Sequence, residues 1–234
     1  MPGGRPNTMR NIRESVVAAA AASVVLSATL LAQDGIKDTE RFIKSGNDMS
    51  AAVADGRLSA KGALDAYNVL VLGNTGNMKG DYKKLVNAES AMNRKVADAR
   101  RIVGEMDKQS AAYFTARSAA LAQIQDAALR EQAKGRLDAS QKEYEAIKAQ
   151  LREASEALAP FTKNLSDQIR YLGAELTPAA ADSLRAQSET LNTKGSDVFA
   201  QVDAAVGSAN QYFNALRPEY RPAPPPADTQ ADAR

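Results

Sequence analysis

The chain has 234 residues and a formal net charge of +2; 44% of the residues are hydrophobic, only 5% are aromatic, and Cys, His and Trp are absent. Without imidazole or thiol groups, the chain lacks the usual general bases and nucleophiles of hydrolases and the usual ligands of zinc, haem iron and copper. We therefore expect a protein that is not an enzyme, with no catalytic, cofactor-binding or metal-binding residues and no cofactor.

Residues 1–32 have the pattern of a signal peptide. Arg5, Arg10 and Arg13 precede an apolar run from Val16 to Leu31, which ends in small residues that offer Ala32 as the last residue before cleavage. The alternative is an uncleaved anchor helix. No Cys follows the run, which excludes lipid attachment of the bacterial lipoprotein type. We expect a periplasmic or secreted chain that begins near Gln33.

Charge gives no support for nucleic-acid binding. Once residues 1–32 are removed, the rest of the chain holds equal numbers of basic and acidic side chains. The positive excess therefore belongs to the signal peptide, and a basic patch of the kind that binds nucleic acid is not indicated.

Two helices are predicted in the first half of the chain. The first runs from about Asp34 to Leu72 and the second from about Asp81 to Ile124, with the turn-forming stretch 73–80 between them. Apolar residues recur at helical spacings in the first helix, namely Ile36, Ile43, Val53, Leu64, Tyr67 and Val71. The second helix carries an apolar or small residue at every seventh position, namely Leu85, Met92, Ala99, Met106, Tyr113 and Ala120.

The strongest pattern lies in a third predicted helix. Its heptad positions are Leu137, Tyr144, Leu151, Leu158, Leu165 and Leu172. The pattern loses phase near residues 125–128, which predicts a reversal before this helix. Pro160 lies off the heptad seam, so we expect a kink and not a stop. Gly173 suits the position just past the helix end.

A fourth helix is predicted from about Pro178 to Leu216, with Thr177 as its N-cap. Its heptad positions are Leu184, Leu191, Val198, Ala205 and Tyr212. A tight reversal between residues 174 and 175 would place Tyr144 opposite Ala205 and Leu137 opposite Tyr212. Residues 217–234 are rich in Pro, and we expect a disordered tail there.

Together these patterns predict an all-α fold, an elongated antiparallel bundle of four long helices with coiled-coil-like heptad packing. The expected organisation is a signal peptide over 1–32, a helical bundle domain over 33–216 and a Pro-rich tail over 217–234. The heptads need covering by neighbouring helices, so one continuous core is expected.

Parts of this pattern resemble a known family. Tyr144, Leu151-Arg152, Ala159-Pro160, Asp167-Gln168, Tyr171-Leu172, Leu176 and Ser183-Leu184 carry the resemblance, as does the Gly80-Asp81-Tyr82-Lys83-Lys84-Leu85 entry to the second helix. The sequence is similar to a family of secreted bacterial helical proteins known only as a domain of unknown function, whose members are often lipoproteins. The resemblance covers most of residues 37–216, and it implies the fold and the compartment but no activity.

The leading functional hypothesis is a non-enzymatic periplasmic or cell-envelope protein that acts through a protein partner, through self-association or as a structural spacer. The alternative is a helical bundle that binds lipids or other amphiphiles through amphipathic faces. Membrane contact is expected only through an uncleaved signal or through such faces, and no nucleic acid is expected as a partner.

Overall fold

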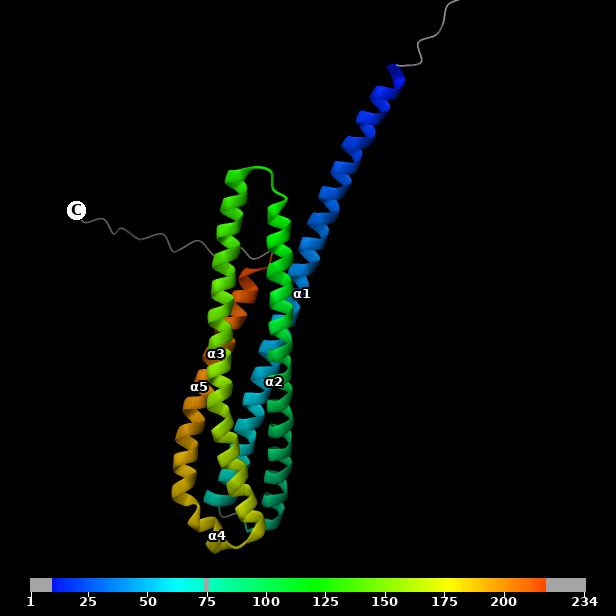
Figure 1. Ribbon diagram of the computed structural model, residues 1–234. Helices are drawn as coiled ribbons and strands as arrows, with labels where there is room; N and C mark the ends of the chain where they lie inside the picture. The colour runs from blue at the N-terminus through cyan, green and yellow to red at the C-terminus, as the bar shows by residue number, and fades with distance from the viewer. Residues whose placement is uncertain (1–9, 74–75, 218–234) are drawn as a thin grey trace, which may run out of the picture.

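The computed structural model describes residues 10–73 and 76–217, with side chains from residue 35 onward. This part of the chain forms five helices and no strand: α1 (Arg10–Leu72), α2 (Met78–Ala122), α3 (Ala127–Ala174), α4 (Pro178–Ser183) and α5 (Arg185–Ala215). In Figure 1, α1, α2, α3 and α5 run alongside one another, and the short α4 crosses the base. The all-α prediction is confirmed. The arrangement of the long helices is consistent with the predicted antiparallel bundle of four.

The first helix begins earlier than predicted. α1 starts at Arg10 and not near Asp34, so it continues through the predicted signal segment. The run from Val16 to Leu31 contains no Pro or Gly to end a helix, and its Ala residues favour one. The side chains of residues 10–34 lie outside the described part, as do residues 1–9 and the tail from 218 onward. The signal-peptide cleavage and the tail's disorder stay predictions.

Both reversals predicted along the first three helices are present. Asn77 caps α2 by accepting a hydrogen bond from the Gly80 backbone N–H, and Gly76 before it has a φ of 69°, which favours glycine. Between α2 and α3, the Asp126 side chain accepts from the Leu129 backbone N–H. α2 thus begins at Met78 and not near Asp81, and the second reversal lies at residues 123–126, close to the predicted 125–128.

The end of α3 differs from the prediction. Pro160 lies inside α3 without ending it, as predicted. Gly173, however, is not beyond the helix end, because α3 continues to Ala174 and Glu175 is its C-cap. A Cβ at Gly173 would collide with the Tyr82 hydroxyl of α2. The glycine therefore permits a close approach between the helices and does not form a turn.

The predicted fourth helix is divided into α4 and α5. Thr177 caps α4 as expected, by accepting from the Ala180 backbone N–H. The break falls at Leu184, whose backbone N–H bonds to Ala181 at the tighter three-residue spacing. Leu184 is 7% exposed and belongs to the lower part of the core. The bend thus lets α4 cover the base of the bundle while Leu184 enters the core.

The predicted register of α3 against α5 is wrong. The Tyr144 ring lies 6.0 Å from the Tyr212 ring and 6.5 Å from the Phe213 ring, one heptad beyond the expected partner Ala205. The Tyr212 hydroxyl is 3.0 Å from the Ser140 hydroxyl, although Leu137 was its expected neighbour. The prediction assumed a tight reversal, whereas residues 178–183 cross the base as a separate helix.

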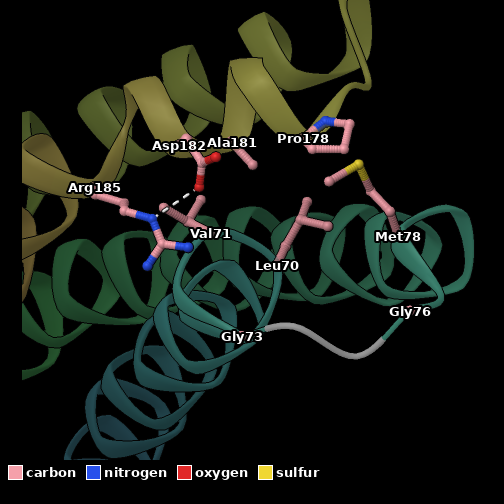
Figure 2. Close-up of a pocket in the computed structure, with 9 residues that line it drawn as sticks. All are labelled: Leu70, Val71, Gly73, Gly76, Met78, Pro178, Ala181, Asp182 and Arg185. Carbon is pink, nitrogen blue, oxygen red and sulfur yellow. Dashed lines mark hydrogen bonds and ion pairs between the residues drawn. The ribbon is translucent and has the colours of Figure 1, made fainter.

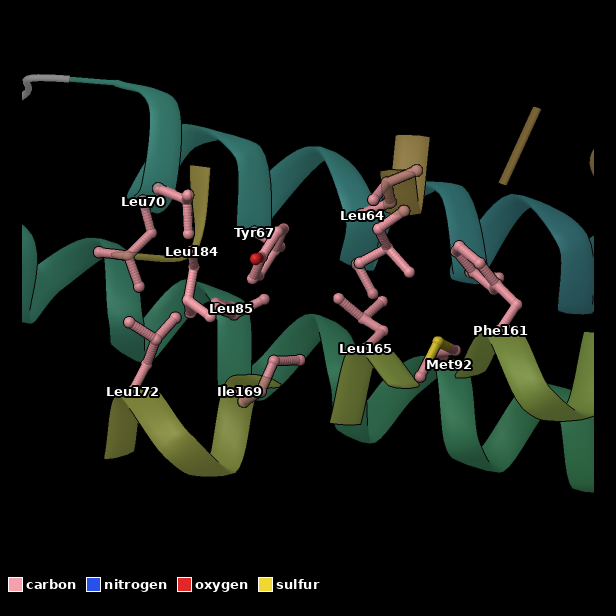
Figure 3. Close-up of a cluster of buried hydrophobic side chains, with 14 of the residues drawn as sticks. Leu64, Tyr67, Leu70, Leu85, Met92, Phe161, Leu165, Ile169, Leu172 and Leu184 are labelled. Carbon is pink, nitrogen blue, oxygen red and sulfur yellow. The ribbon is translucent and has the colours of Figure 1, made fainter. Parts of the chain in front are cut away.

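The core consists of two hydrophobic clusters along the bundle. Figure 3 shows the lower one, in which Tyr67 of α1, Leu85 of α2 and Leu165 of α3 point toward the common axis. The upper cluster holds six aromatic rings from all four long helices. These are Phe42, Tyr113, Phe114, Tyr144, Tyr212 and Phe213.

Candidate functional site

The sequence predicted no catalytic, cofactor or metal residues, and the features of the structure on which a function can rest are hollows, polar clusters and exposed apolar surfaces. No group of three or more Asp or Glu side chains in the described part of the chain is placed to hold a metal ion. Within residues 35–73 and 76–217, no helical segment is long and apolar enough to cross a membrane.

A hollow of 440 Å³ lies at the base of the bundle, between the end of α1, the start of α2 and the crossing helix α4. In Figure 2, the side chains of Leu70, Met78 and Pro178 approach one another on one side of this base hollow. On the other side, Arg185 Nε lies 2.9 Å from Asp182 Oδ1. The lining residues are Leu70, Val71, Gly73, Gly76, Met78, Pro178, Ala181, Asp182 and Arg185.

The chemistry of the base hollow suits binding more than reaction. Polar and apolar groups contribute about equally to its walls, and its two charged side chains neutralise each other. The lining residues that the structure describes supply no hydroxyl, amine or thiol nucleophile. A small apolar group with a weakly polar end would fit this lining.

Tyr67 forms a polar contact inside the lower cluster. Its side chain is completely buried, and its hydroxyl donates to Gln168 Oε1 on α3. Gln168 Nε2 in turn donates to Asn164 Oδ1 at 2.6 Å. Burial raises the pKa of Tyr67 to about 12. A neutral, satisfied hydroxyl at this position links α1 to α3.

Asn68, the next residue of α1, forms a second polar contact, which joins α1 to α5. Asn68 Nδ2 donates to Asn192 Oδ1 at 2.7 Å, and the Asn68 Oδ1 accepts from Ser188 Oγ at 2.9 Å. Ser188 is completely buried. Paired polar groups inside a helical bundle lose these bonds if one helix slides, so this group favours a single register of α1 against α5.

Alkaline pH should unfold the bundle because of its buried tyrosines. Burial raises the pKa of Tyr67 to about 12, and it also raises the pKa values of Tyr144 and Tyr212. The unfolded chain ionises these groups near their ordinary value of ~10. The buried tyrosines therefore contribute their full stabilisation below about pH 10, and the free energy of unfolding falls as the pH rises toward 12.

Thermal unfolding followed by circular dichroism from about pH 9 to 12 tests this prediction. Tyr67→Phe should be less stable at neutral pH, because it loses the bond to Gln168, but its melting temperature should fall less steeply with pH. Tyr171→Phe, at a residue that is 43% exposed, is the control and should keep the wild-type slope. Equal slopes for all three proteins would contradict the prediction.

A shallow depression on α3 involves the segment that carries the family resemblance. It is lined by Pro160, Lys163, Asn164, Asp167, Gln168 and Tyr171. The hydrogen bond from Lys163, with Arg170 as a second cation, lowers the pKa of Asp167. The carboxylate is thus ionised and already paired within its own helix, which is typical of a solvated surface.

An apolar stripe runs along the exposed side of α1. Its residues are Ile36, Leu58, Val69 and Leu72, which are 53%, 58%, 46% and 42% exposed. At 3.6 residues per turn they fall within about 60° of the helix circumference and span about 54 Å, with the exposed Glu40 and Asp65 in the same sector between them. Ile36 was one of the apolar residues at helical spacing that predicted the first helix, and it is exposed. The α1 stripe is a surface that sequence periodicity did not separate from the buried face.

Comparison with known families gives one match. The family model described as "Protein of unknown function (DUF2959)" matches residues 30–216. The chain belongs to this family. No curated protein and no solved structure matches the chain.

Membership of the DUF2959 family confirms the resemblance found in the sequence to a domain of unknown function. The matched region includes α2, α3, α4 and α5 and the part of α1 that carries the stripe. It therefore includes both the base hollow and the α1 stripe. The family description assigns no activity.

Proposed function

We propose that this protein is a non-enzymatic spacer of the cell envelope that binds a protein partner through the α1 stripe. The observation that carries the proposal is the exposed row of Ile36, Leu58, Val69 and Leu72 on one side of a packed helix. Scattered apolar residues on a surface are ordinary, but four that share one side of a helix offer a face on which a partner can pack.

The dimensions of the bundle support a spacer. α2 has 45 residues and α3 has 48, so each is about 70 Å long at 1.5 Å per residue. The contacts of Tyr67 and Asn68 tie α1 to α3 and to α5, which favours a bundle of fixed register. A rigid rod of this length holds its two ends at a constant separation.

The envelope location rests on the N-terminal sequence. Arg residues followed by the apolar run from Val16 to Leu31 are typical of a segment that directs export. Cell fractionation with N-terminal sequencing tests this part. We expect a chain that begins near Gln33 in the soluble envelope fraction. Recovery of residues 1–32 in the membrane pellet would replace this proposal with the anchored form.

Site-specific photo-crosslinking in cells tests the partner. A photoreactive residue at position 58 or 69, on the α1 stripe, should give a discrete protein adduct, whereas one at exposed position 153 on α3 should not. Leu58→Glu combined with a crosslinker at position 69 should abolish the adduct without lowering the melting temperature, because Leu58 is exposed. Equal adducts from positions 69 and 153, or no adduct from the stripe, would contradict the proposal.

The base hollow favours a second candidate function, the binding of a small amphiphile. Its mixed lining, with Leu70, Met78 and Pro178 on one side and the Asp182–Arg185 ion pair on the other, fits a molecule with an apolar body and a polar end. Titration with a fluorescent fatty acid is the test. Met78→Glu would place a charge against Leu70 and Pro178 and should abolish saturable binding, while Leu58→Glu should leave it intact. Identical titrations for the two variants would remove this candidate.

A further inference from the structure

The hairpin tip, defined as residues 115–137, projects beyond the packed part of the bundle. It contains the end of α2, the connection and the start of α3. None of the described residues between Phe114 and Tyr144 is buried. In Figure 1, α5 ends before this level and α1 leans away from it. The tip is therefore covered only at its lower end, where Arg117 lies close to Gly35 of α1 and Leu137 packs against the upper cluster.

The end of the hairpin tip is held in a defined shape. Asp126 Oδ1 accepts from the Leu129 backbone N–H at 2.9 Å. Arg130 Nη1 donates to the backbone oxygen of Ile124, also at 2.9 Å. These bonds fix the connection and leave the Leu129 side chain 57% exposed at its outer end. The exposed leucine thus lies beside a turn that hydrogen bonds hold in place.

The hairpin tip also holds the positive excess of the bundle. Between residues 35 and 217, the residues outside the tip have equal numbers of basic and acidic side chains. The tip itself has four basic and two acidic ones, namely Arg117, Arg130, Lys134, Arg136, Asp126 and Glu131. A second copy of this tip would meet the same positive excess. An apolar contact with an anionic surface has no such repulsion.

The position of the hairpin tip also favours contact with an anionic surface. α1 leaves the bundle at the end where the tip lies (Figure 1). The apolar run from Val16 to Leu31, which directs the chain to a membrane in our proposal, therefore precedes this end and not the base. The same end of the rod that follows the export segment carries an exposed leucine and a basic excess.

We propose that the hairpin tip contacts an anionic lipid surface, with Leu129 entering the interface and Lys134 and Arg136 facing the headgroups. Basic side chains around a shallowly inserted apolar residue are the usual composition of interfacial contacts. The biological meaning of this contact rests on the envelope location proposed above. The spacer would then stand on a membrane by its tip and present the α1 stripe to its partner.

The chain contains no Trp, so one introduced indole reports its own environment. In the full chain, Leu129→Trp serves as the probe and Leu58→Trp, at a residue of similar exposure on α1, serves as the control. The vesicles contain phosphatidylcholine alone or with about 30% phosphatidylglycerol, with brominated acyl chains as quencher. We expect a blue shift and quenching at position 129 with the anionic vesicles only, and neither change at position 58.

Charge reversal tests the headgroup contact. Lys134→Glu with Arg136→Glu, in the Leu129→Trp background, should weaken vesicle binding by about tenfold or more, because each basic residue near an anionic surface contributes about 1 kcal/mol. Lys61→Glu with Lys194→Glu makes the same change of charge at exposed positions away from the tip. This control pair should leave the affinity within about twofold. Equal weakening by the two pairs would show a non-specific effect of net charge and overturn the proposal.

Two further results would also overturn it. If the protein sediments with vesicles while the probe at position 129 stays unchanged, the N-terminal apolar run alone binds the membrane. If the emission of the Trp at position 129 shifts with protein concentration in the absence of vesicles, the tip binds a second copy of the chain. The vesicle assay uses purified protein, whereas the α1 stripe is tested by crosslinking in cells. Failure of one proposal is therefore distinguishable from failure of the other.

Discussion

Replacing Phe42 by Ala should lower the free energy of unfolding by about 3 to 5 kcal/mol, the range for removing a buried aromatic side chain. Phe42 is 2% exposed, and its ring contacts every other ring of the upper aromatic cluster. It stacks on the Tyr113 ring at 4.2 Å and meets the Phe213 ring edge-on at 5.4 Å. The loss includes these aromatic contacts as well as the cavity that remains.

Chemical denaturation followed by circular dichroism measures this loss. Ile36→Ala is the matched control, because it truncates a large side chain six residues earlier on the same helix, where the side chain is 53% exposed. It should change the free energy of unfolding by less than about 0.5 kcal/mol. If Ile36→Ala costs as much as Phe42→Ala, the upper end of α1 is not packed as described.

The heptad pattern of the third predicted helix was the most reliable signal in the sequence. Tyr144, Leu151, Leu158, Leu165 and Leu172 are all buried on α3. This follows from physics, because a long helix with one regular apolar seam can bury that seam only against other helices. Leu137 is partly buried at the edge of the upper cluster, since the pattern there continues into the uncovered hairpin tip.

Periodicity could not separate the two apolar faces of α1. Tyr67 is buried and Val69 is exposed, although both belong to apolar stretches of the same helix. Which face is covered depends on where α2 and α5 lie, and that is a tertiary property. One residue did indicate the buried face of α1. Gly46 lies where α1 closely approaches Phe213 of α5, and its lack of a side chain permits that approach.

The register and the candidate sites also depended on tertiary arrangement. The register of α3 against α5 differs from the predicted one because α4 lies between them in the chain. A six-residue helix across the base is too short to show a periodic pattern in the sequence. The base hollow combines α1, the start of α2 and α4, segments separated by about a hundred residues. The hairpin tip was missed because heptad position Ala120 predicts burial, whereas Ala120 is exposed, since α5 ends below that level and α1 leans away from it.

Replacing Gly46 by Val should destabilise the bundle by about 3 kcal/mol, near the upper end for overpacking a core. A Cβ at position 46 would overlap the ring of Phe213. That ring is completely buried and is held by the Phe42 and Tyr212 rings at 5.4 and 5.1 Å, so it has no free space to move into. The usual gain in helix propensity on replacing glycine, at most ~1 kcal/mol, is smaller than this cost.

The matched control is Gly104→Val on α2, where an added Cβ meets nothing within 4 Å. This variant should be as stable as the wild type or slightly more stable, so the two glycines should give effects of opposite sign or of clearly different size. A double variant gives the decisive measurement. Because Phe213→Ala removes the ring that obstructs position 46, Gly46→Val with Phe213→Ala should be less destabilised than the two single effects added together. Strict additivity would mean that the ring and the glycine do not meet, and the packing of α1 on α5 would need revision.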